Sequence, residues 1–188
     1  MIENKFPVTV EGLEETGKRV LWYTPRFRKT AIGMPLVVIV LLVVAKLWQR
    51  QTSLLLLILL GAAMIFYCLS STRKVPRNMA QQLYRDLKKK TEDDEEPQNH
   101  TRVTEGGVLV IGVDDDSDQM YPFSTIERVF GTEHFIVAMN TSHRAIMFRR
   151  DAFVEGDEAA LLSAFRTHCP TARFDEKSLT PAPQKPEA

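Results

Sequence analysis

The densest group of side chains that could bind a metal ion lies in the distal half of the chain. It consists of Asp114, Asp115, Asp116 and Asp118. Closely spaced carboxylates can supply the oxygen ligands that Ca²⁺ prefers. The EF-hand pattern is absent, because there is no glycine at its sixth position and no fitting glutamate at its twelfth. The sequence therefore favours a solvated turn over a calcium site.

Histidine and cysteine, the other common ligands and nucleophiles, do not fall in a catalytic or metal-binding spacing. Cys68 and Cys169 lie far apart, and the adjacency of His168 to Cys169 does not make a nucleophile and its base. The sequence also lacks a phosphate-binding loop, a dinucleotide-binding fingerprint and a nucleophile elbow. We therefore expect no enzymatic activity, no catalytic residue, no metal ion and no cofactor.

A basic cluster in the distal half is the candidate contact for an anionic group. It is formed by Arg144, Arg149 and Arg150, and guanidinium groups suit phosphorylated lipid headgroups and acidic partners. Strand alternation places Arg149 and Arg150 on opposite sides, which weakens a shared site. Salt bridges to Asp151 or other nearby carboxylates are the alternative interpretation.

Two apolar runs, residues 31–48 and 53–69, precede this half of the chain and lie only four residues apart. A membrane-spanning helix needs roughly 17–25 apolar residues. Both runs lie at the short end of this range, and Lys46 is the one charged residue within them. The pattern predicts an antiparallel transmembrane hairpin over residues 31–69.

The distribution of lysine and arginine predicts the orientation of this hairpin. Twelve basic residues flank the two runs, whereas two lie at or beside the turn between them. Basic residues favour the cytoplasmic side. We therefore expect a multi-pass protein of the cell inner membrane with both termini in the cytoplasm.

The distal half, residues 99–175, alternates short apolar segments with turn residues. Strands are expected at 101–104, 108–113, 120–123, 126–131, 135–140 and 145–149, followed by a helix from residue 156 that ends before Pro170. The pattern predicts a small α+β domain of antiparallel strands with a closing helix. From residue 98 to 175 there are seven basic and twelve acidic residues, which argues against nucleic acid as a partner.

The remaining segments connect or flank these two parts. Residues 1–30 form a predicted cytoplasmic head, residues 70–98 a juxtamembrane helix with an acidic linker, and residues 176–188 a disordered tail. Pro76 is expected to open the helix, whose apolar stripe contains Met79, Leu83 and Leu87. This stripe fits either a helix on the membrane surface or a connecting helix packed on the distal domain.

The order of these parts, together with three stretches of sequence, resembles the bacterial YcxB-like proteins. The stretches are residues 121–129, residues 135–148 and residues 149–153 with the acidic helix that follows. The resemblance covers roughly residues 5–170 and implies a two-helix membrane protein with a small C-terminal domain. It also leaves open an arrangement similar to that of pleckstrin-homology domains. It implies no catalytic residues.

Together these observations give two functional hypotheses. The first is a membrane-anchored, non-enzymatic interaction module that presents its β-domain to an unidentified protein partner at the cytoplasmic face. The alternative is a lipid- or small-molecule-sensing regulator of pleckstrin-homology type, in which the arginine cluster reads headgroups. The lipid bilayer is a partner in both, and homo-oligomerisation through the small residues Gly61, Ala62 and Ala63 is left open.

Overall fold

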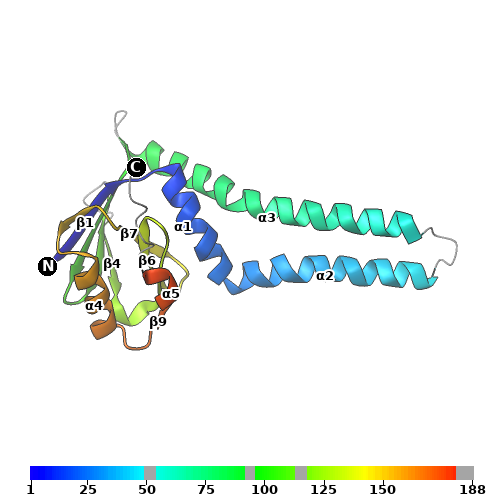
Figure 1. The fold of residues 1–188 in the computed structure, drawn as a ribbon. Helices are drawn as coiled ribbons and strands as arrows, with labels where there is room; N and C mark the ends of the chain where they lie inside the picture. The colour runs from blue at the N-terminus through cyan, green and yellow to red at the C-terminus, as the bar shows by residue number, and fades with distance from the viewer. Residues whose placement is uncertain (49–53, 92–95, 113–117, 181–188) are drawn as a thin grey trace, which may run out of the picture. The chain divides into compact units, whose positions relative to one another are not determined.

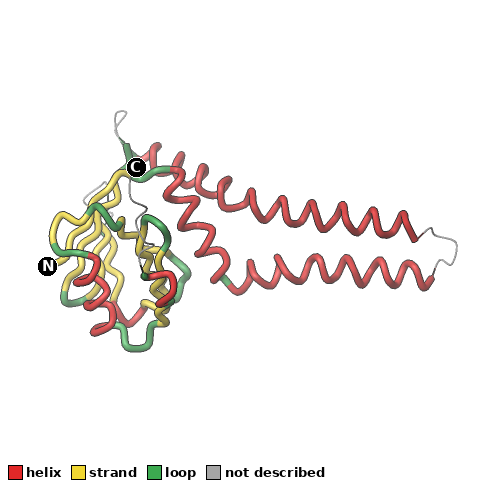
Figure 2. The backbone as a smooth tube through the Cα atoms, in the orientation of Figure 1, coloured by secondary structure: helices red, strands yellow, loops and turns green. Residues whose placement is uncertain are grey.

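The computed structural model describes residues 1–48, 54–91, 96–112 and 118–180 (Figure 1). The contacts divide the chain into two compact units. Unit 1 comprises Met1–Thr16 and Ala80–Ala188, and unit 2 comprises Gly17–Met79. Unit 1 contains all the described strands, whereas the described part of unit 2 is helical (Figure 2).

Three helices follow the first strand. They are α1 (Val10–Tyr23), α2 (Pro25–Trp48) and α3 (Leu54–Lys90). Pro76 lies inside α3 instead of opening a new helix, so the second apolar run and the predicted juxtamembrane helix form one element. The turn predicted between the two runs lies outside the described residues.

None of the helices in the described ranges combines the length and the apolar character that are needed to cross a membrane. In α2, basic residues near both ends leave only residues 30–45 free of charge, and the apolar part of α3 covers only residues 54–69 before basic residues follow. The predicted transmembrane hairpin over residues 31–69, and with it the predicted inner-membrane location, is therefore wrong.

The first sheet of unit 1 has five strands in the order β4-β3-β2-β1-β8. Each pairing is antiparallel, from Ile2 opposite Val103 in β1–β2 to Gly107 opposite Pro122 in β3–β4. The strands are β1 (Ile2–Pro7), β2 (Gln98–Thr104), β3 (Gly107–Ile111), β4 (Gln119–Pro122) and β8 (Phe153–Glu155).

Strand β1 lies inside this sheet, between β2 and β8. In the sequence, helices α1, α2 and α3 therefore lie between β1 and β2, which are neighbours in the sheet. The predicted fold, in which residues 99–175 alone form a membrane-tethered domain resembling pleckstrin-homology domains, lacks this strand and is wrong. Hydrophobic patterning shows that a segment can form a strand, but not which distant strand it joins.

The second sheet has the order β7-β6-β5-β9. Strands β5 (Ile126–Gly131), β6 (Phe135–Asn140) and β7 (Ala145–Arg149) confirm the strands predicted at these positions. The short β9 (Arg173–Phe174) pairs in parallel with β5. Every residue of β6 is buried, as expected for a central strand that is covered on both faces.

The main core of unit 1 lies between the sheets and helix α4 (Glu158–His168). The helix begins where the Asp157 carboxylate accepts a hydrogen bond from the Ala160 N–H at 2.7 Å, a favourable N-cap. The Phe165 ring meets the edges of Phe148 at 5.8 Å and Phe123 at 6.2 Å between ring centroids. The predicted closing helix is therefore present and anchored by aromatic contacts.

Two asparagine side chains join the sheets at the edge of β7. The Asn4 amide donates to the Arg149 carbonyl at 2.8 Å and accepts from the Arg149 N–H at 3.0 Å. The Asn99 amide donates to the Met147 carbonyl at 3.1 Å. Asn4 is fully buried, so its side chain takes the place of a neighbouring strand for β7.

The C-terminal end of α3 packs within unit 1. Ala80 forms a small cluster with Val8 and Leu13, and Tyr84 and Leu87 pack against it. The sequence left open whether this helix lies on a membrane surface or connects the two parts and packs on the domain. The contacts are those of a connecting helix packed on the domain. Of the residues in the predicted stripe, Met79 and Leu83 are about half exposed.

The prediction of a disordered tail over residues 176–188 is wrong for its first residues. Residues Glu176–Leu179 form the short helix α5, and Leu179 is buried in the main core. The remainder of the predicted tail lies outside the described residues.

Candidate functional site

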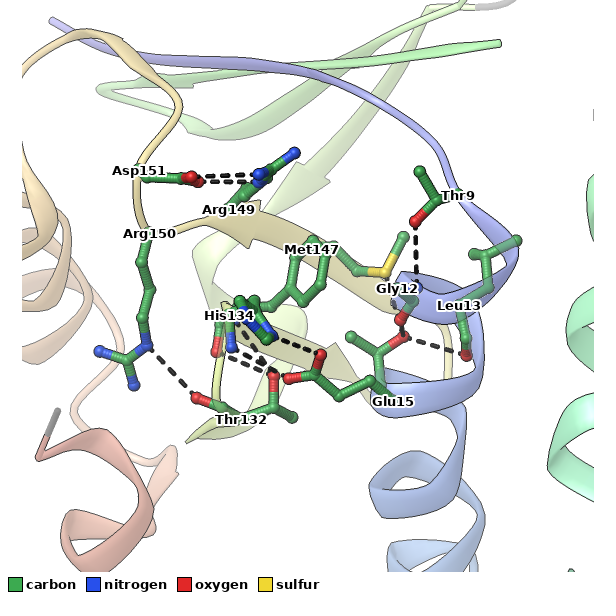
Figure 3. Close-up of polar contacts among 12 residues, drawn as sticks. Thr9, Gly12, Leu13, Glu15, Thr132, His134, Met147, Arg149, Arg150 and Asp151 are labelled. Carbon is green, nitrogen blue, oxygen red and sulfur yellow. Dashed lines mark hydrogen bonds and ion pairs between the residues drawn. The ribbon is translucent and has the colours of Figure 1, made fainter. Parts of the chain in front are cut away.

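The three arginines of the predicted anion site occupy different environments. Arg144 is exposed and donates to the Gln119 side chain at 3.1 Å. The Arg149 guanidinium forms a two-point ion pair with Asp151, at 2.7 and 3.0 Å. This pair matches the salt-bridge interpretation of the sequence, and Figure 3 shows the Arg149 and Arg150 guanidinium groups lying apart.

Arg150 is a structural brace. Its side chain is only 13% exposed and pairs with the Glu158 carboxylate of α4. Its Nε donates to the Thr132 carbonyl at 3.3 Å, and its terminal nitrogen donates to the Ser178 carbonyl at 3.3 Å. One side chain thus ties the β5–β6 turn to α4 and α5. With the guanidinium engaged in this way, the described geometry does not bring the three arginines together as one site.

A second polar cluster lies where the start of α1 meets the β5–β6 turn (Figure 3). The Glu15 carboxylate accepts from the His134 backbone N–H at 3.0 Å and lies 3.0 Å from His134 Nδ1. Partial burial alone would raise the pKa of Glu15, but hydrogen bonds from Thr132 and His134 lower it below 4.5. The sequence carries no signal for this contact, because Glu15 and His134 are 119 positions apart.

The same end of α1 is fixed by close packing. The Thr9 hydroxyl accepts from the Gly12 N–H at 3.2 Å and so caps the helix. A Cβ at Gly12 would lie 2.8 Å from the Phe135 ring, so only glycine permits this approach. The Thr16 hydroxyl donates to the Gly12 carbonyl at 2.9 Å and lies 3.2 Å from the Met147 sulfur. Glu15 and His134 therefore belong to a helix-docking contact.

A third polar set lies on β1 and β2 of the first sheet. The Glu3 carboxylate lies 2.6 Å from His100 Nε2 and 3.1 Å from an Arg102 terminal nitrogen. The hydrogen bond with His100 and the Arg102 guanidinium lower the pKa of Glu3. These are cross-strand pairs that stabilise the sheet.

The residues considered as metal ligands or nucleophiles do not assemble into a reactive site. Within the described residues there is no group of three or more histidine, cysteine or acidic side chains placed to hold a metal ion. Asp114, Asp115 and Asp116 lie outside them. Burial raises the pKa of the Cys169 thiol to about 11, which disfavours the reactive thiolate. The ring of the neighbouring His168 stacks on Phe123 at 4.9 Å.

A row of exposed apolar side chains follows α2 in unit 2. We call this row the α2 apolar face; its members are 47–59% exposed. At 3.6 residues per turn these positions span roughly 160° of the helix surface, a single continuous face. They are Leu36, Val37, Ile39, Val40, Val43 and Val44. These residues belong to the apolar run that was predicted from the sequence, but they were predicted to face lipid.

No protein-family model matches the chain, and no significant similarity was found to curated proteins or to solved structures. The resemblance to YcxB-like proteins therefore stays a prediction.

Proposed function

We propose that this chain is a non-enzymatic protein-interaction module that binds its partner through the α2 apolar face. The observation that carries the proposal is the exposure of six neighbouring aliphatic side chains on one side of one helix. Proteins that function alone in water rarely expose large contiguous apolar patches, and such patches commonly mark binding surfaces. Helix packing in an apolar groove or against another helix is an established mode of recognition.

The energetics favour a partner with a matching apolar surface. Fully burying one aliphatic side chain is worth about 1.5–3 kcal/mol. Covering six half-exposed side chains would therefore contribute roughly 5–9 kcal/mol from this chain. Association itself costs about 4–15 kcal/mol in lost freedom of motion. A stable complex thus requires a comparable contribution from the partner, so its surface must also be apolar.

Contacts in unit 1 support a role without catalysis. Several side chains there that could act in acid–base or nucleophilic chemistry are instead engaged in structural interactions. Glu15 is paired with His134, and Cys169 is buried with a raised pKa. The contacts of unit 1 thus hold the start of α1 and the end of α3 in place.

Site-specific photo-crosslinking of the full-length chain in living cells tests the proposal. A photoreactive phenylalanine analogue replaces Val40, and in a matched control it replaces Lys74, an exposed residue of α3. We expect a covalent protein adduct at Val40 and none at Lys74. Absence of any protein adduct at Val40 and at Val43, with both variants expressed and folded, would refute the proposal.

A further inference from the structure

We infer that residues 173–179 form a C-terminal latch, whose attachment to unit 1 holds the start of α1 in its docked position. The latch comprises β9 and α5, and the start of α1 comprises residues 10–16, the part of this helix that belongs to unit 1. Both contact the β5–β6 turn, residues 131–135. These contacts lie within unit 1 and do not involve the α2 apolar face.

One side of the β5–β6 turn is bound to α1. The Glu15 carboxylate accepts a hydrogen bond from the His134 backbone N–H at 3.0 Å and another from the Thr132 hydroxyl. This hydroxyl also accepts from the Phe135 N–H at 3.2 Å, and the Thr132 N–H donates to the Phe135 carbonyl at 2.7 Å. The turn is therefore closed by its own hydrogen bonds, and its backbone fixes the hydroxyl that contacts α1.

The other side of the turn is bound to the C-terminal latch. The Ser178 hydroxyl accepts from the Gly131 N–H at 2.9 Å. The Arg150 guanidinium donates to the Thr132 carbonyl and to the Ser178 carbonyl, each at 3.3 Å. The Arg150 backbone N–H donates to the His134 carbonyl at 2.9 Å. Arg150 thus connects the latch to the same turn residues that contact α1.

Thr132 links the two attachments, and Figure 3 shows it lying between Arg150 and Glu15. Its hydroxyl contacts α1, whereas its carbonyl contacts the guanidinium that holds the latch. Residues within one hydrogen-bond network affect stability non-additively, and an equilibrium coupling acts equally in both directions. Release of the latch therefore weakens the docking of α1, and loss of the α1 contact weakens the latch by the same factor.

The latch is small enough to detach while both sheets stay folded. Its strand has two residues and its helix four. Of residues 173–179, all of which are described, only Leu179 is buried. Elements with few buried contacts open locally at a lower free energy than the whole unit. Since the chain passes from unit 1 to unit 2 within α1, release of the latch acts on the segment that precedes this boundary.

Hydrogen exchange of the full-length chain tests the coupling. Ser178→Ala removes the hydroxyl that accepts from Gly131, and Lys177→Ala, at the preceding exposed position, is the matched control. In Ser178→Ala the amides of residues 13–16 should exchange roughly 3–10-fold faster than in the parent, whereas Lys177→Ala should leave their rates unchanged. Amides of β6, whose residues are all buried, should still exchange more slowly than those of α1, which shows that unit 1 stays folded.

The reciprocal variant completes the test. Glu15→Ala should accelerate exchange of the amides of residues 178–180 by a similar factor, and Glu11→Ala, at an exposed position of the same helix, should not. In the double variant Ser178→Ala/Glu15→Ala, the acceleration in α1 should be smaller than the product of the two single effects. Parent-like exchange of α1 in Ser178→Ala, or single effects that multiply in the double variant, would overturn the inference.

Discussion

The Asn4 side chain is expected to be among the most sensitive positions of unit 1. It is fully buried and exchanges two hydrogen bonds with the Arg149 backbone, at 2.8 and 3.0 Å. Asn4→Ala removes both bonds and leaves the Arg149 N–H and carbonyl without these partners. Each bond contributes about 0.5–1.5 kcal/mol, and an unsatisfied buried group costs about 1–3 kcal/mol. We therefore expect a loss of roughly 2–4 kcal/mol in the free energy of unfolding.

The assay must report on unit 1 specifically. Both tryptophans, Trp22 and Trp48, belong to unit 2, so intrinsic fluorescence does not follow the β-domain. Hydrogen exchange of peptides from β1 and β7, measured over a series of temperatures, follows the unfolding of unit 1 directly. At roughly 4 °C per kcal/mol for a unit of this size, the melting temperature of unit 1 should fall by roughly 8–16 °C.

Two further variants make this prediction sharp. Asn4→Asp keeps an acceptor for the Arg149 N–H but turns a second carboxylate oxygen toward the Arg149 carbonyl. Its loss of stability should equal or exceed that of Asn4→Ala, and should narrow as the pH falls and the carboxyl becomes a donor. Gln98→Ala, at an exposed position of β2, should change stability by less than about 0.5 kcal/mol. A change this small in Asn4→Ala would refute the bridging role of Asn4.

Three other expectations follow from unit 1. The pKa of Glu15 in the folded chain lies below 4.5, so the ionised carboxylate stabilises the fold above that pH and the stabilisation is lost in acid. The free energy of unfolding of Glu15→Gln, measured by urea titration, should therefore be lower than that of the parent at pH 7, and the two values should converge as the pH falls. Gly131→Ala should destabilise unit 1 by about 1–3 kcal/mol and expose α5 to proteolysis, since its Cβ would collide with the Ser178 carbonyl oxygen; unchanged cleavage would contradict this. With Cys68→Ser as background, Cys169 should react with a thiol reagent only on unfolding, because it is 1% exposed and its pKa is raised to about 11; rapid reaction of the native chain would exclude this environment.

The local elements of the second sheet could be predicted from sequence because their signals are local. Strands β5, β6 and β7 were found with their bounds, since apolar segments there are separated by clear turn residues. The Arg149–Asp151 pair was among the alternatives for a similar reason, because the residues are two positions apart.

The contacts that connect distant segments could not be predicted. The pairing of β1 with β2 and the approach of Glu15 to His134 leave no periodic trace in either segment. The apolar runs show a different difficulty. Composition indicated correctly that residues 36–44 are apolar and helical, but a lipid-facing helix and an exposed interaction helix share this composition, and run length did not separate them.

The position of β1 determines the order in which the sheet can assemble during biosynthesis. β1 is translated before residues 8–97, and its two neighbours, β2 and β8, follow only afterwards. The five-stranded sheet therefore cannot be completed until residues 153–155 have left the ribosome. Until then β1 lacks a neighbouring strand in the sheet, and pairing it with β8 must bring together segments that lie far apart in the sequence. Pauses in translation after α3 would lengthen the lifetime of this nascent state, and chaperones that bind apolar segments would meet α2 before its β-domain has formed.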